Sequence, residues 1–461
     1  MFKKTKILCT IGPASEGKRV LSKMVKAGMN AFRINTAYGS LKEYERKIKT
    51  VWSVARIPVV VDLKGPEVRM KCETSFMAQK GDIVSVGFKP SDKVSFNRSI
   101  YSQIHVGDII LLDKGKVKSK IIAKSKGKIK LKLYSHCCFR NGLGVNIPDN
   151  KLDIPALSSH DKDVIKLCKR LDVDYVALSF TRDIKDVLEL KRRLRGSSVG
   201  VIAKIENRQG IQNIDDIIGV CDGVMIARGD LGIEIPFQEI PLVQKDIITR
   251  CNSMGKISIV ATEMMQSMVE NPEPTRAETS DVANAILDGA DCVMLSAESA
   301  VGKYPIASVK AMAEIALEVE THHPIRPLDE KSHDKVSLAI SKAVTSIIET
   351  ADVDKIVVAT HTGYTAMLIS NFRICKDIIA ITDNSKTCRK MNLVYAVVPV
   401  CHSVFKEKDR VVEIAKFCFR KKLVSKNDLV LFTAGLYNKK PTTNIVQLHK
   451  MSEILSYRAT N

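Results

Sequence analysis

Residues 199–230, VGVIAKIENRQGIQNIDDIIGVCDGVMIARGD, contain two short apolar strands separated by a segment with helical spacing. A strand, a helix and a second strand form the repeating unit of a parallel α/β sheet. The same unit recurs along the chain and predicts eight parallel strands. These strands are expected at 6–12, 30–37, 58–65, 175–180, 199–206, 223–229, 258–263 and 292–296.

Eight βα units in unbroken order predict a closed (β/α)8 barrel, known as the TIM barrel. Segments of a different character interrupt this series after the third strand and follow it after the eighth. We therefore expect an α/β protein with three domains. They are a TIM barrel (1–69 and 153–324), an inserted small β-barrel lid domain (70–152) and a C-terminal α/β open-sheet domain (325–461).

The inserted segment alternates polar and apolar residues, for example at 82–88 and 107–112, and shows no clear helix. Nine lysines lie between Lys114 and Lys132, mostly at alternate positions, so a strand there would have one strongly basic face. Such a face is either simply solvated or a groove for anions or nucleic acid. No aromatic residue interleaves these lysines to stack on bases.

The pattern changes again after Pro324. A helical stretch at 336–350 precedes several strands separated by helical segments, which predicts an open α/β sheet. These strands are expected at 355–361, 377–383, 396–402, 428–435 and 444–450.

The composition is that of a globular protein, with 45% hydrophobic and 27% charged residues in 461. Lysine and arginine number 72 against 51 acidic residues, and the net charge of +21 attracts polyanions or anionic metabolites. The 12 cysteines include no CxxC pair, which indicates free thiols rather than a zinc site. No apolar stretch approaches the ~18 residues of a membrane helix and no signal peptide is evident. We expect a cytoplasmic protein with no membrane partner.

Polar side chains stand at the carboxyl ends of the expected barrel strands, where barrel enzymes hold their active sites. Packing does not explain so many polar residues at the ends of apolar strands. They are Arg33, Asn35, Asp62, Lys64, Ser179, Lys204, Glu206, Arg228, Asp230, Thr262 and Ser296.

Lys204 and Glu206 are two residues apart on one strand and therefore point to the same side of the sheet. Asp230, at the end of the next strand, supplies a second carboxylate beside Glu206. Two carboxylates together with substrate oxygens suit Mg2+ better than zinc. The alternative is an ion pair from Lys204 to Glu206 or Asp230 that only closes the top of the barrel.

The segment from Arg228 to Gly232 leaves its strand with two glycines, which lets backbone amides approach an anion closely. Arg33, Lys64 and Lys204 would surround that anion with positive charge, as phosphoryl transfer requires. Each of these charges taken alone is also compatible with an ordinary surface residue.

Thr262 and Ser296 end two further strands, where their hydroxyls would bind a carboxylate or relay a proton through water. The alternative is that each hydroxyl caps the following helix, which is the commoner role.

Six segments, taken together in barrel order, resemble the pyruvate kinase family over nearly the whole chain. They are KILCTIGPAS (6–15), GMNAFRIN (28–35), DLKGPEVR (62–69), AKIEN (203–207), ARGDLGIEIP (227–236) and PTRAETSDVANAILDGADCVMLSAES (274–299). The resemblance implies transfer of the phosphoryl group of phosphoenolpyruvate to ADP, giving pyruvate and ATP in the final step of glycolysis. It also implies a homotetramer and, in many members, a sugar-bisphosphate effector.

The same resemblance implies a role for each matching residue. Glu206 and Asp230 would hold Mg2+, and Lys204 would stabilise the phosphoryl group in flight and the developing enolate. The amides of Gly229 and Asp230, together with Thr262, would bind the substrate carboxylate. The expected catalytic residues are Lys204, Arg33 and Thr262.

The resemblance places the nucleotide near Arg33, Asn35, Tyr38 and Arg69, where Arg33 also holds the phosphoryl oxygens. Two positions depart from the family. Tyr38 stands where a histidine is usual, and Leu143 stands where the lid usually has a lysine. We therefore expect Leu143→Lys to strengthen ADP binding.

Many members of the family require K+. The positions that hold it correspond to Asn35, Asp62 and the carbonyl of Leu63, while Ala37 lacks the usual hydroxyl. A water or the neighbouring hydroxyl of Thr36 would have to replace it. The glutamate at position 67 is the residue found in K+-dependent members, so K+ is expected as a second cofactor.

The effector is the least direct of these expectations. His361 and Tyr364 are atypical of the family's phosphate loop, and Lys439 and Lys440 are the expected partners of a second phosphate. The residues that match the phosphate loop are Thr360, Thr362, Gly363 and Thr365.

Two alternatives compete with the kinase. The first is another Mg2+-dependent barrel enzyme acting on phosphoenolpyruvate or pyruvate, which leaves the lid and the third domain unexplained. The second is a nucleic-acid-binding protein on a retired barrel, driven by the net charge of +21. The presence of all the expected chemical groups argues against nucleic acid as a partner.

Overall fold

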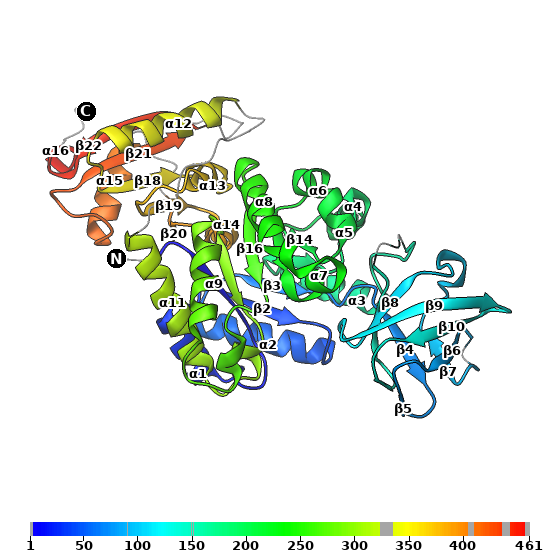
Figure 1. The fold of residues 1–461 in the computed structure, drawn as a ribbon. Coiled ribbons are helices and arrows are strands. Elements are labelled where there is room, and N and C mark those ends of the chain that lie inside the picture. Colours follow the sequence, from blue (N-terminus) through cyan, green and yellow to red (C-terminus); the bar gives the residue numbers. More distant parts are fainter. Residues whose placement is uncertain are drawn as a thin grey trace.

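The computed structural model describes residues 3–89, 91–148, 150, 152–322, 335–403, 410–435 and 443–456. Figure 1 shows three parts in a row, with a barrel in the middle. The inserted β domain, called the lid below, lies on the right of the barrel, and the C-terminal α/β domain lies at the upper left.

Eight parallel strands form the central barrel. They are β1 (Lys6–Thr10), β2 (Ala31–Asn35), β3 (Val59–Asp62), β13 (Tyr175–Leu178), β14 (Gly200–Ile205), β15 (Gly223–Ala227), β16 (Ile257–Ala261) and β17 (Cys292–Leu295). They close in the order β1-β17-β16-β15-β14-β13-β3-β2, which confirms the eight expected strands and the TIM barrel. Nearly all of their residues are buried, because helices cover the outside and side chains fill the inside.

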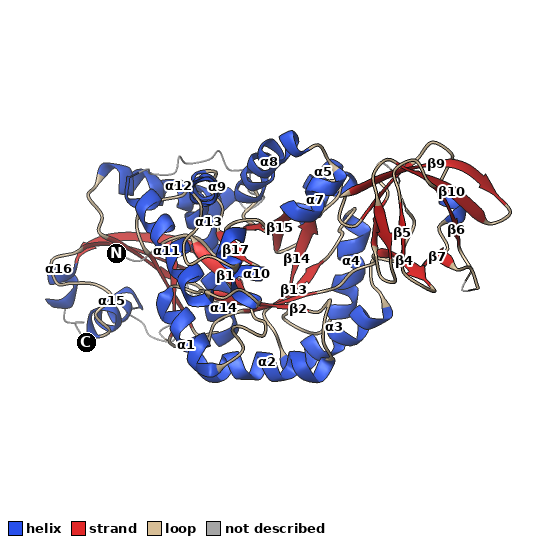
Figure 2. Cartoon of the chain, turned by 60° about the horizontal axis from the view of Figure 1, so that its bottom comes forward, coloured by secondary structure: helices blue, strands red, loops and turns tan. Residues whose placement is uncertain are grey.

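Helices surround the barrel and connect its strands (Figure 2). They are α1 (Lys18–Ala27), α2 (Leu41–Val54), α3 (Ser159–Leu171), α4 (Ile184–Leu194), α5 (Arg208–Gln212), α6 (Ile214–Val220), α7 (Arg228–Glu234), α8 (Ile240–Ser253), α9 (Arg276–Leu287), α10 (Ala297–Ala300) and α11 (Pro305–His322), with 3-10 turns at Phe237–Glu239 and Gln266–Val269. Helices α2, α3 and α9 start with capping boxes at Ser40, Ser158 and Thr275. These boxes satisfy the first backbone N–H groups and so fix where the loops at the top of the barrel end.

The lid is a second, smaller closed barrel. Its strands are β4 (Val68–Cys72), β6 (Ile83–Gly87), β7 (Val94–Phe96), β8 (Ile109–Leu112), β9 (Val117–Ser125), β10 (Lys128–Leu133) and β12 (Gly144–Asn146), beside a separate pair formed by β5 (Phe76–Ala78) and β11 (Cys137–Phe139), and a 3-10 turn at Tyr101–Gln103. The closed barrel confirms the expected β architecture, and β6 and β8 coincide with the two alternating segments noted in the sequence.

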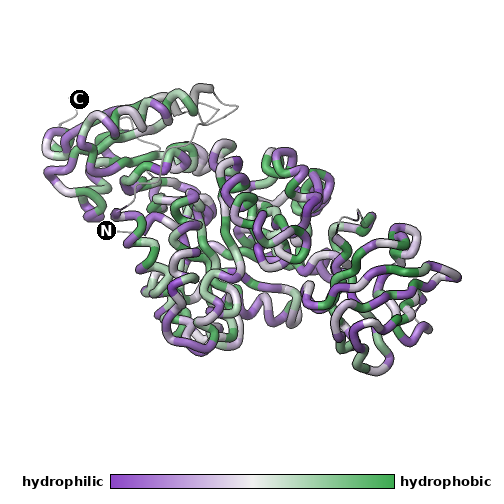
Figure 3. The backbone as a smooth tube through the Cα atoms, viewed as in Figure 1, coloured by the Kyte–Doolittle hydropathy of each residue, from purple (hydrophilic) through white to green (hydrophobic). Residues whose placement is uncertain are grey.

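The lysine-rich segment forms the antiparallel pair of β9 and β10. In β10 the residues Ile129 and Leu131 are buried, while Lys128, Lys130 and Lys132 are exposed. The alternation of hydrophilic and hydrophobic residues along this pair can be followed in Figure 3. The basic face expected from the sequence is therefore present on the outside of the lid.

The C-terminal domain is an open five-stranded sheet. Its strands are β18 (Lys355–Ala359), β19 (Ile378–Thr382), β20 (Val397–Cys401), β21 (Leu429–Gly435) and β22 (Thr443–Lys450), and its helices are α12 (Lys335–Thr350), α13 (Tyr364–Asn371), α14 (Ser385–Lys390), α15 (Arg410–Arg420) and α16 (Met451–Ser456), with a 3-10 turn at Met391–Leu393. The strand order is β20-β19-β18-β21-β22, and only β22 is antiparallel to its neighbour. This arrangement confirms the expected open sheet. None of the helices within the described residues has the length and apolar composition needed to span a membrane.

The hydrophobic cores do not follow the three parts. One continuous cluster runs from the barrel, through residues such as Ile7 and Leu295, into the C-terminal domain, through residues such as Ile356 and Ile378. The lid has its own cluster around Ile121 and is not part of the large one. The barrel and one face of the C-terminal sheet are thus a single packed unit.

A buried arginine reinforces this junction. Arg373, just after α13, has a left-handed backbone (φ 51°) and a side chain that is 0% exposed. Its guanidinium lies 3.1 Å from Asp291 Oδ1 and donates to Asn252 Oδ1 at 2.6 Å and to the Gly289 carbonyl. It also stacks over the Tyr395 ring at 4.8 Å. The C-terminal domain therefore inserts a fixed charge into the base of the barrel.

We expect Arg373→Met to destabilise the protein by about 3–5 kcal/mol, because it leaves the buried Asp291 carboxylate without its cation. Thermal unfolding measures the effect as a fall in the midpoint. Arg420→Met, at the exposed end of α15, is the control and should leave the midpoint unchanged. Equal midpoints for both variants would contradict the role given to Arg373.

Candidate active site

Lys204 lies at the centre of the charged residues at the top of the barrel. Its Nζ is 2.9 Å from Glu206 Oε1 and 3.2 Å from Asp62 Oδ1, and it donates to Ser179 Oγ at 2.7 Å. Burial alone would lower the pKa of Lys204, but Asp62 and Glu206 raise it above its ordinary value. Lys204 is therefore a fixed positive charge. The ion pair to Glu206, an alternative to a metal site in the sequence analysis, is present.

Asp62, the last residue of β3, joins Lys204 to Arg33 of β2. Arg33 donates from Nε to Asp62 Oδ2 at 2.8 Å and places Nη2 2.6 Å from the same oxygen. The third guanidinium nitrogen donates to Thr10 Oγ1 at 2.9 Å. Burial would raise the pKa of Asp62, but Lys204 and Arg33 together hold it below its ordinary value. Asp62 thus orients both expected catalytic cations.

Glu206 is the residue whose charge is least well compensated. Its Oε1 faces Lys204, and its Oε2 accepts the backbone N–H of Phe180 at 2.7 Å. Burial raises the pKa of the Glu206 carboxyl; Lys204 opposes this shift, while the carboxylates of Asp230 and Asp62 add to it. Among the described residues, the ion pairs of these carboxylates are with Lys204 and Arg33, so the three negative charges exceed the two positive ones.

The residues present fit Mg2+ as a further positive charge. Glu206 and Asp230 are close enough to repel each other, and a divalent cation between them would relieve that repulsion. No group of three or more His, Cys, Asp or Glu side chains suited to a metal exists within the described part of the chain. Two protein carboxylates completed by substrate oxygens and water form the kind of site that Mg2+ accepts.

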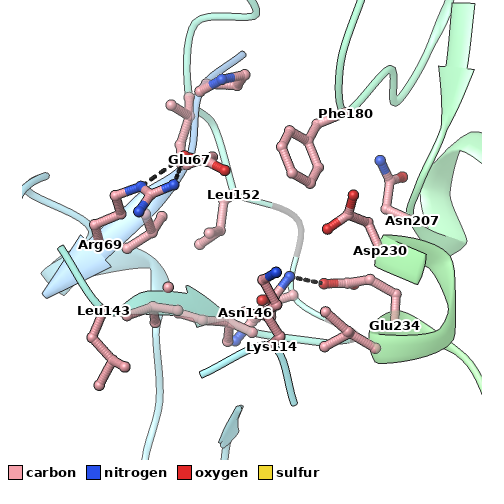
Figure 4. Close-up of a pocket in the computed structure, with 18 of the residues that line it drawn as sticks. Glu67, Arg69, Lys114, Leu143, Asn146, Leu152, Phe180, Asn207, Asp230 and Glu234 are labelled. Atoms are coloured by element: carbon pink, nitrogen blue, oxygen red, sulfur yellow. Dashed lines mark hydrogen bonds and ion pairs between the residues drawn. The ribbon is translucent and has the colours of Figure 1, made fainter. Parts of the chain in front are cut away.

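A pocket of about 450 Å³ opens between the barrel and the lid. In Figure 4 the Asp230 carboxylate points into this pocket, between Phe180 and Asn207. The lid contacts the barrel across the pocket, because Asn146 Nδ2 donates to Glu234 Oε1 at 3.0 Å. The expected metal ligand Asp230 therefore lines a pocket between the barrel and the lid.

Thr262 and Gly229 lie together, as expected for residues that share a ligand. However, they are bonded to each other: the Gly229 N–H donates to Thr262 Oγ1 at 2.8 Å, and the Thr262 hydroxyl donates to the Ala261 carbonyl at 2.6 Å. Thr262 also has a left-handed backbone (φ 67°), which is unusual for a β-branched residue. A substrate carboxylate has to displace the Thr262 hydroxyl to reach the Gly229 amide.

Two other strand-end residues have separate surroundings. The Lys64 backbone N–H donates to Asp161 Oδ1 at 3.0 Å. Ser296 Oγ is buried, with no hydrogen-bond partner among the described residues, while its backbone N–H donates to Glu298. The Ser296 hydroxyl does not cap α10, so the helix-cap alternative is wrong for this residue.

The residues expected to hold K+ are already engaged. Asn35 Oδ1 accepts the Ala37 N–H at 3.0 Å, and the Leu63 carbonyl accepts the Ser179 hydroxyl at 2.7 Å. Thr36, the neighbouring hydroxyl, donates to the Asp62 backbone carbonyl at 2.7 Å. Oxygen atoms accept more than one contact, so these bonds leave the K+ expectation open.

Of the four expected nucleotide residues, Tyr38 and Arg69 lie at the edge of the same pocket, whereas Arg33 and Asn35 do not line it. Tyr38 is 79% exposed, and Arg69 donates to Glu67 at 2.7 Å and to the Gly142 carbonyl at 2.7 Å. Both residues line the pocket. Leu143 also lines the pocket, but it is 2% exposed and belongs to the lid core, and its side chain points away from the pocket centre in Figure 4. A lysine cannot simply replace it as a nucleotide contact.

Three contacts of the site were not expected from the sequence. Ser179 accepts a hydrogen bond from Lys204, Thr10 accepts one from Arg33, and the Phe180 amide donates to Glu206. Ser179 was already among the polar residues expected at strand ends, and Thr10 is the last residue of β1, so the same rule could have identified it. The Phe180 contact depends on a left-handed backbone (φ 54°), which no sequence pattern marks.

The expected effector loop satisfies its own polar groups. Thr360 Oγ1 accepts the Gly363 N–H at 3.0 Å, and Thr362 Oγ1 accepts the Tyr364 N–H at 3.4 Å. Thr365 is buried in the first turn of α13. Lys439 and Lys440 lie outside the described residues. The neighbouring His361 pairs with Asp383 at 2.8 Å, which places a carboxylate beside the loop.

Comparisons with known proteins match nearly the whole chain. The family model for the pyruvate kinase barrel domain covers residues 2–309, and the model for the pyruvate kinase alpha/beta domain covers residues 338–449. A pyruvate kinase of Staphylococcus haemolyticus is 40% identical over 476 residues, which is 98% of this chain and 81% of that protein. A pyruvate kinase of Bacillus licheniformis is 38% identical over 478 residues, which is 99% of this chain and 82% of that protein.

The fold is similar to a solved structure described as a pyruvate kinase from Cryptosporidium parvum. The TM-score is 0.91 at 27% sequence identity, over 97% of this chain and 96% of that chain. Neither alternative function raised by the sequence receives comparable support from these matches.

We expect Leu143→Lys to destabilise the lid and to leave ADP binding no stronger, because the new ammonium would be buried in an apolar core at a cost of about several kcal/mol. Thermal unfolding and the KM for ADP measure the two effects. Leu143→Met conserves volume and is the matched control. A lower KM for ADP with an unchanged unfolding midpoint would restore the original expectation.

Proposed function

The chain belongs to the pyruvate kinase family and is a phosphotransferase that moves the phosphoryl group of phosphoenolpyruvate to ADP, and we propose that the charged residues around Lys204 carry out this transfer. The observation that supports the proposal is the position of Lys204. A buried ammonium held between Asp62 and Glu206 stays charged and aims at the top of the barrel. Such a preorganised charge is what phosphoryl transfer needs most.

In this proposal Glu206 and Asp230 hold Mg2+, which supplies positive charge for the phosphoryl and enolate oxygens of the substrate. Lys204 stabilises the phosphoryl group as it leaves, and Arg33 holds its oxygens. Asp62 keeps Lys204 and Arg33 in place, since it forms an ion pair with each of them. The cations therefore do not need to reorganise when charge moves from phosphoenolpyruvate to ADP.

The substrate carboxylate binds at the amides of Gly229 and Asp230. Its oxygen takes the place of Thr262 Oγ1 on the Gly229 N–H, and the Thr262 hydroxyl turns to donate to that carboxylate. After transfer, the enolate is protonated at carbon. In this proposal the hydroxyl of Ser296 passes a proton through water toward Thr262, and the supporting observation is that this buried hydroxyl has no partner among the described residues.

The nucleotide is proposed to bind in the pocket under the lid, near Arg33, Asn35, Tyr38 and Arg69. Tyr38 offers an exposed ring at the pocket edge. Arg69 forms an ion pair with Glu67, which partly neutralises its charge before a diphosphate binds. The basic face on the outside of the lid adds long-range attraction for anionic substrates.

We infer K+ as a second cofactor, held by Asn35, Asp62 and the Leu63 carbonyl. The supporting observation is that Asn35 and Asp62 are register partners at the ends of the neighbouring strands β2 and β3, and Leu63 directly follows Asp62. Replacing K+ with Na+ in the activity assay tests this inference, and equal rates would remove it.

The assembly and its regulation are also proposals. Phe237 and Leu242 expose large apolar side chains on and before α8, which favours self-association into the expected homotetramer. Sedimentation velocity tests this self-association, and a monomer would refute it.

An effector of the sugar-bisphosphate class would have to compete with the hydrogen bonds inside the Thr360 loop. The expected cytoplasmic location follows from the glycolytic reaction.

We expect the wild-type protein to form pyruvate from phosphoenolpyruvate and ADP in the presence of Mg2+, and Lys204→Met to lower kcat by about 100- to 1000-fold, because a preorganised charge is lost. A coupled assay for pyruvate measures both rates. Lys303→Met, a surface lysine paired with Glu270, is the matched control and should keep full activity.

Circular dichroism has to confirm that the Lys204 variant is folded, since its carboxylate neighbours lose their partner. A folded variant with wild-type kcat would exclude Lys204 from the transfer.

A further inference from the structure

Arg228 forms the densest set of polar contacts near the site, yet none of them reaches the substrate pocket. Its side chain is 8% exposed, and its guanidinium donates to the Thr262 carbonyl from Nη2 at 2.8 Å and from Nε at 3.3 Å. The other edge makes two bonds to the Asp281 carboxylate of α9, at 2.8 Å and 2.7 Å. Asp281 thus anchors the arginine to a helix on the outside of the barrel.

The backbone that Arg228 holds is strained. Thr262 and Glu263 both have positive φ angles, 67° and 57°, and neither is glycine. A β-branched residue in this conformation is unfavourable and persists only where its surroundings impose it. The two bonds from Arg228 to the Thr262 carbonyl impose it here.

Arg228 also joins the two loops that meet at the substrate carboxylate. Its own backbone begins α7 and leads directly into Gly229 and Asp230, whereas its side chain reaches the loop after β16. The Thr262 hydroxyl then lies on the Gly229 amide at 2.8 Å. One residue therefore sets the distance between the hydroxyl and the amide.

We propose that Arg228, anchored by Asp281, is a positioning residue that holds the Thr262 carbonyl in place. With the carbonyl fixed, the Thr262 side chain can give up its hydrogen bond with the Gly229 amide and bind the substrate carboxylate instead. Before substrate binds, the Thr262 oxygen occupies the place of a carboxylate oxygen. On binding, only the side chain turns, because the carbonyl on the other side of the residue stays fixed. This inference rests on the proposed function, since it assigns the carboxylate to that amide.

This clamp of Arg228 and Asp281 on the Thr262 carbonyl predicts a specific kinetic signature. Arg228→Lys loses the planar pair of donors, and Asp281→Asn keeps the shape of the anchor but removes its charge. Both variants should raise the KM for phosphoenolpyruvate by about 10- to 100-fold, because the misplaced hydroxyl and amide no longer fit one carboxylate. The KM for ADP should stay within about twofold, because ADP does not use these groups.

The double variant should be no worse than Arg228→Lys alone, because both residues act through the same carbonyl. Arg389→Lys is the matched control. Arg389 donates to the buried Asp174 at 3.0 Å in the junction with the C-terminal domain, so its loss lowers stability without touching the carboxylate site. This variant should lower the unfolding midpoint and leave both KM values unchanged.

Each result decides one point. An unchanged KM for phosphoenolpyruvate in folded Asp281→Asn or Arg228→Lys overturns the clamp, as does an equal rise in Arg389→Lys. Loss of kcat with both KM values unchanged also overturns it, since that is the result of a purely structural role. Absence of turnover in the wild-type protein overturns the proposed function instead, so the two failures are distinguishable.

Discussion

Charge placed inside a barrel has to be paired, because an isolated ion in an apolar interior costs far more than a folded domain gains overall. In this protein the pairing depends on Asp62. Its two oxygens bind Arg33 on one side and Lys204 on the other, and Ser179 adds a hydroxyl to the same group. The aspartate holds both cations in place, while Glu206 and Asp230 still repel each other. The same pairing that stabilises the barrel top therefore leaves an excess of negative charge at Glu206 and Asp230, and this imbalance is the main electrostatic feature of the site.

The position of each charged group is set by strand closure. Asp62 ends β3 and Lys204 stands near the end of β14, and the strand between them, β13, supplies Ser179 in the loop that follows it. In the sequence, the whole lid is inserted between β3 and β13. Parallel pairing nevertheless brings their carboxyl ends to the same edge, which is why residues from distant segments meet within 3.2 Å.

Much of this could be predicted from the sequence, for definable reasons. The eight barrel strands are runs of Val, Ile and Ala buried on both faces, and such runs end visibly at polar residues like Asp62 and Glu206. Spacing also identified the basic face of the lid. Side-chain direction within loops was not accessible, because it depends on backbone conformations that several residue types adopt. The burial of Leu143, the bond between Thr262 and Gly229, and the contact from Phe180 to Glu206 all belong to this class.

In the described part of the chain, the C-terminal domain shares a hydrophobic core with the barrel, whereas the lid does not. One face of the C-terminal sheet shares its apolar cluster with the barrel, with Arg373 at the junction, while the other face packs a cluster of its own. We therefore expect the shared face to couple the unfolding of the two parts. The lid encloses its own interior and is joined by two chain crossings. Evolution can therefore exchange or resize the lid as an independent module, whereas any change at the base of the barrel has to be matched by a change in the domain below it.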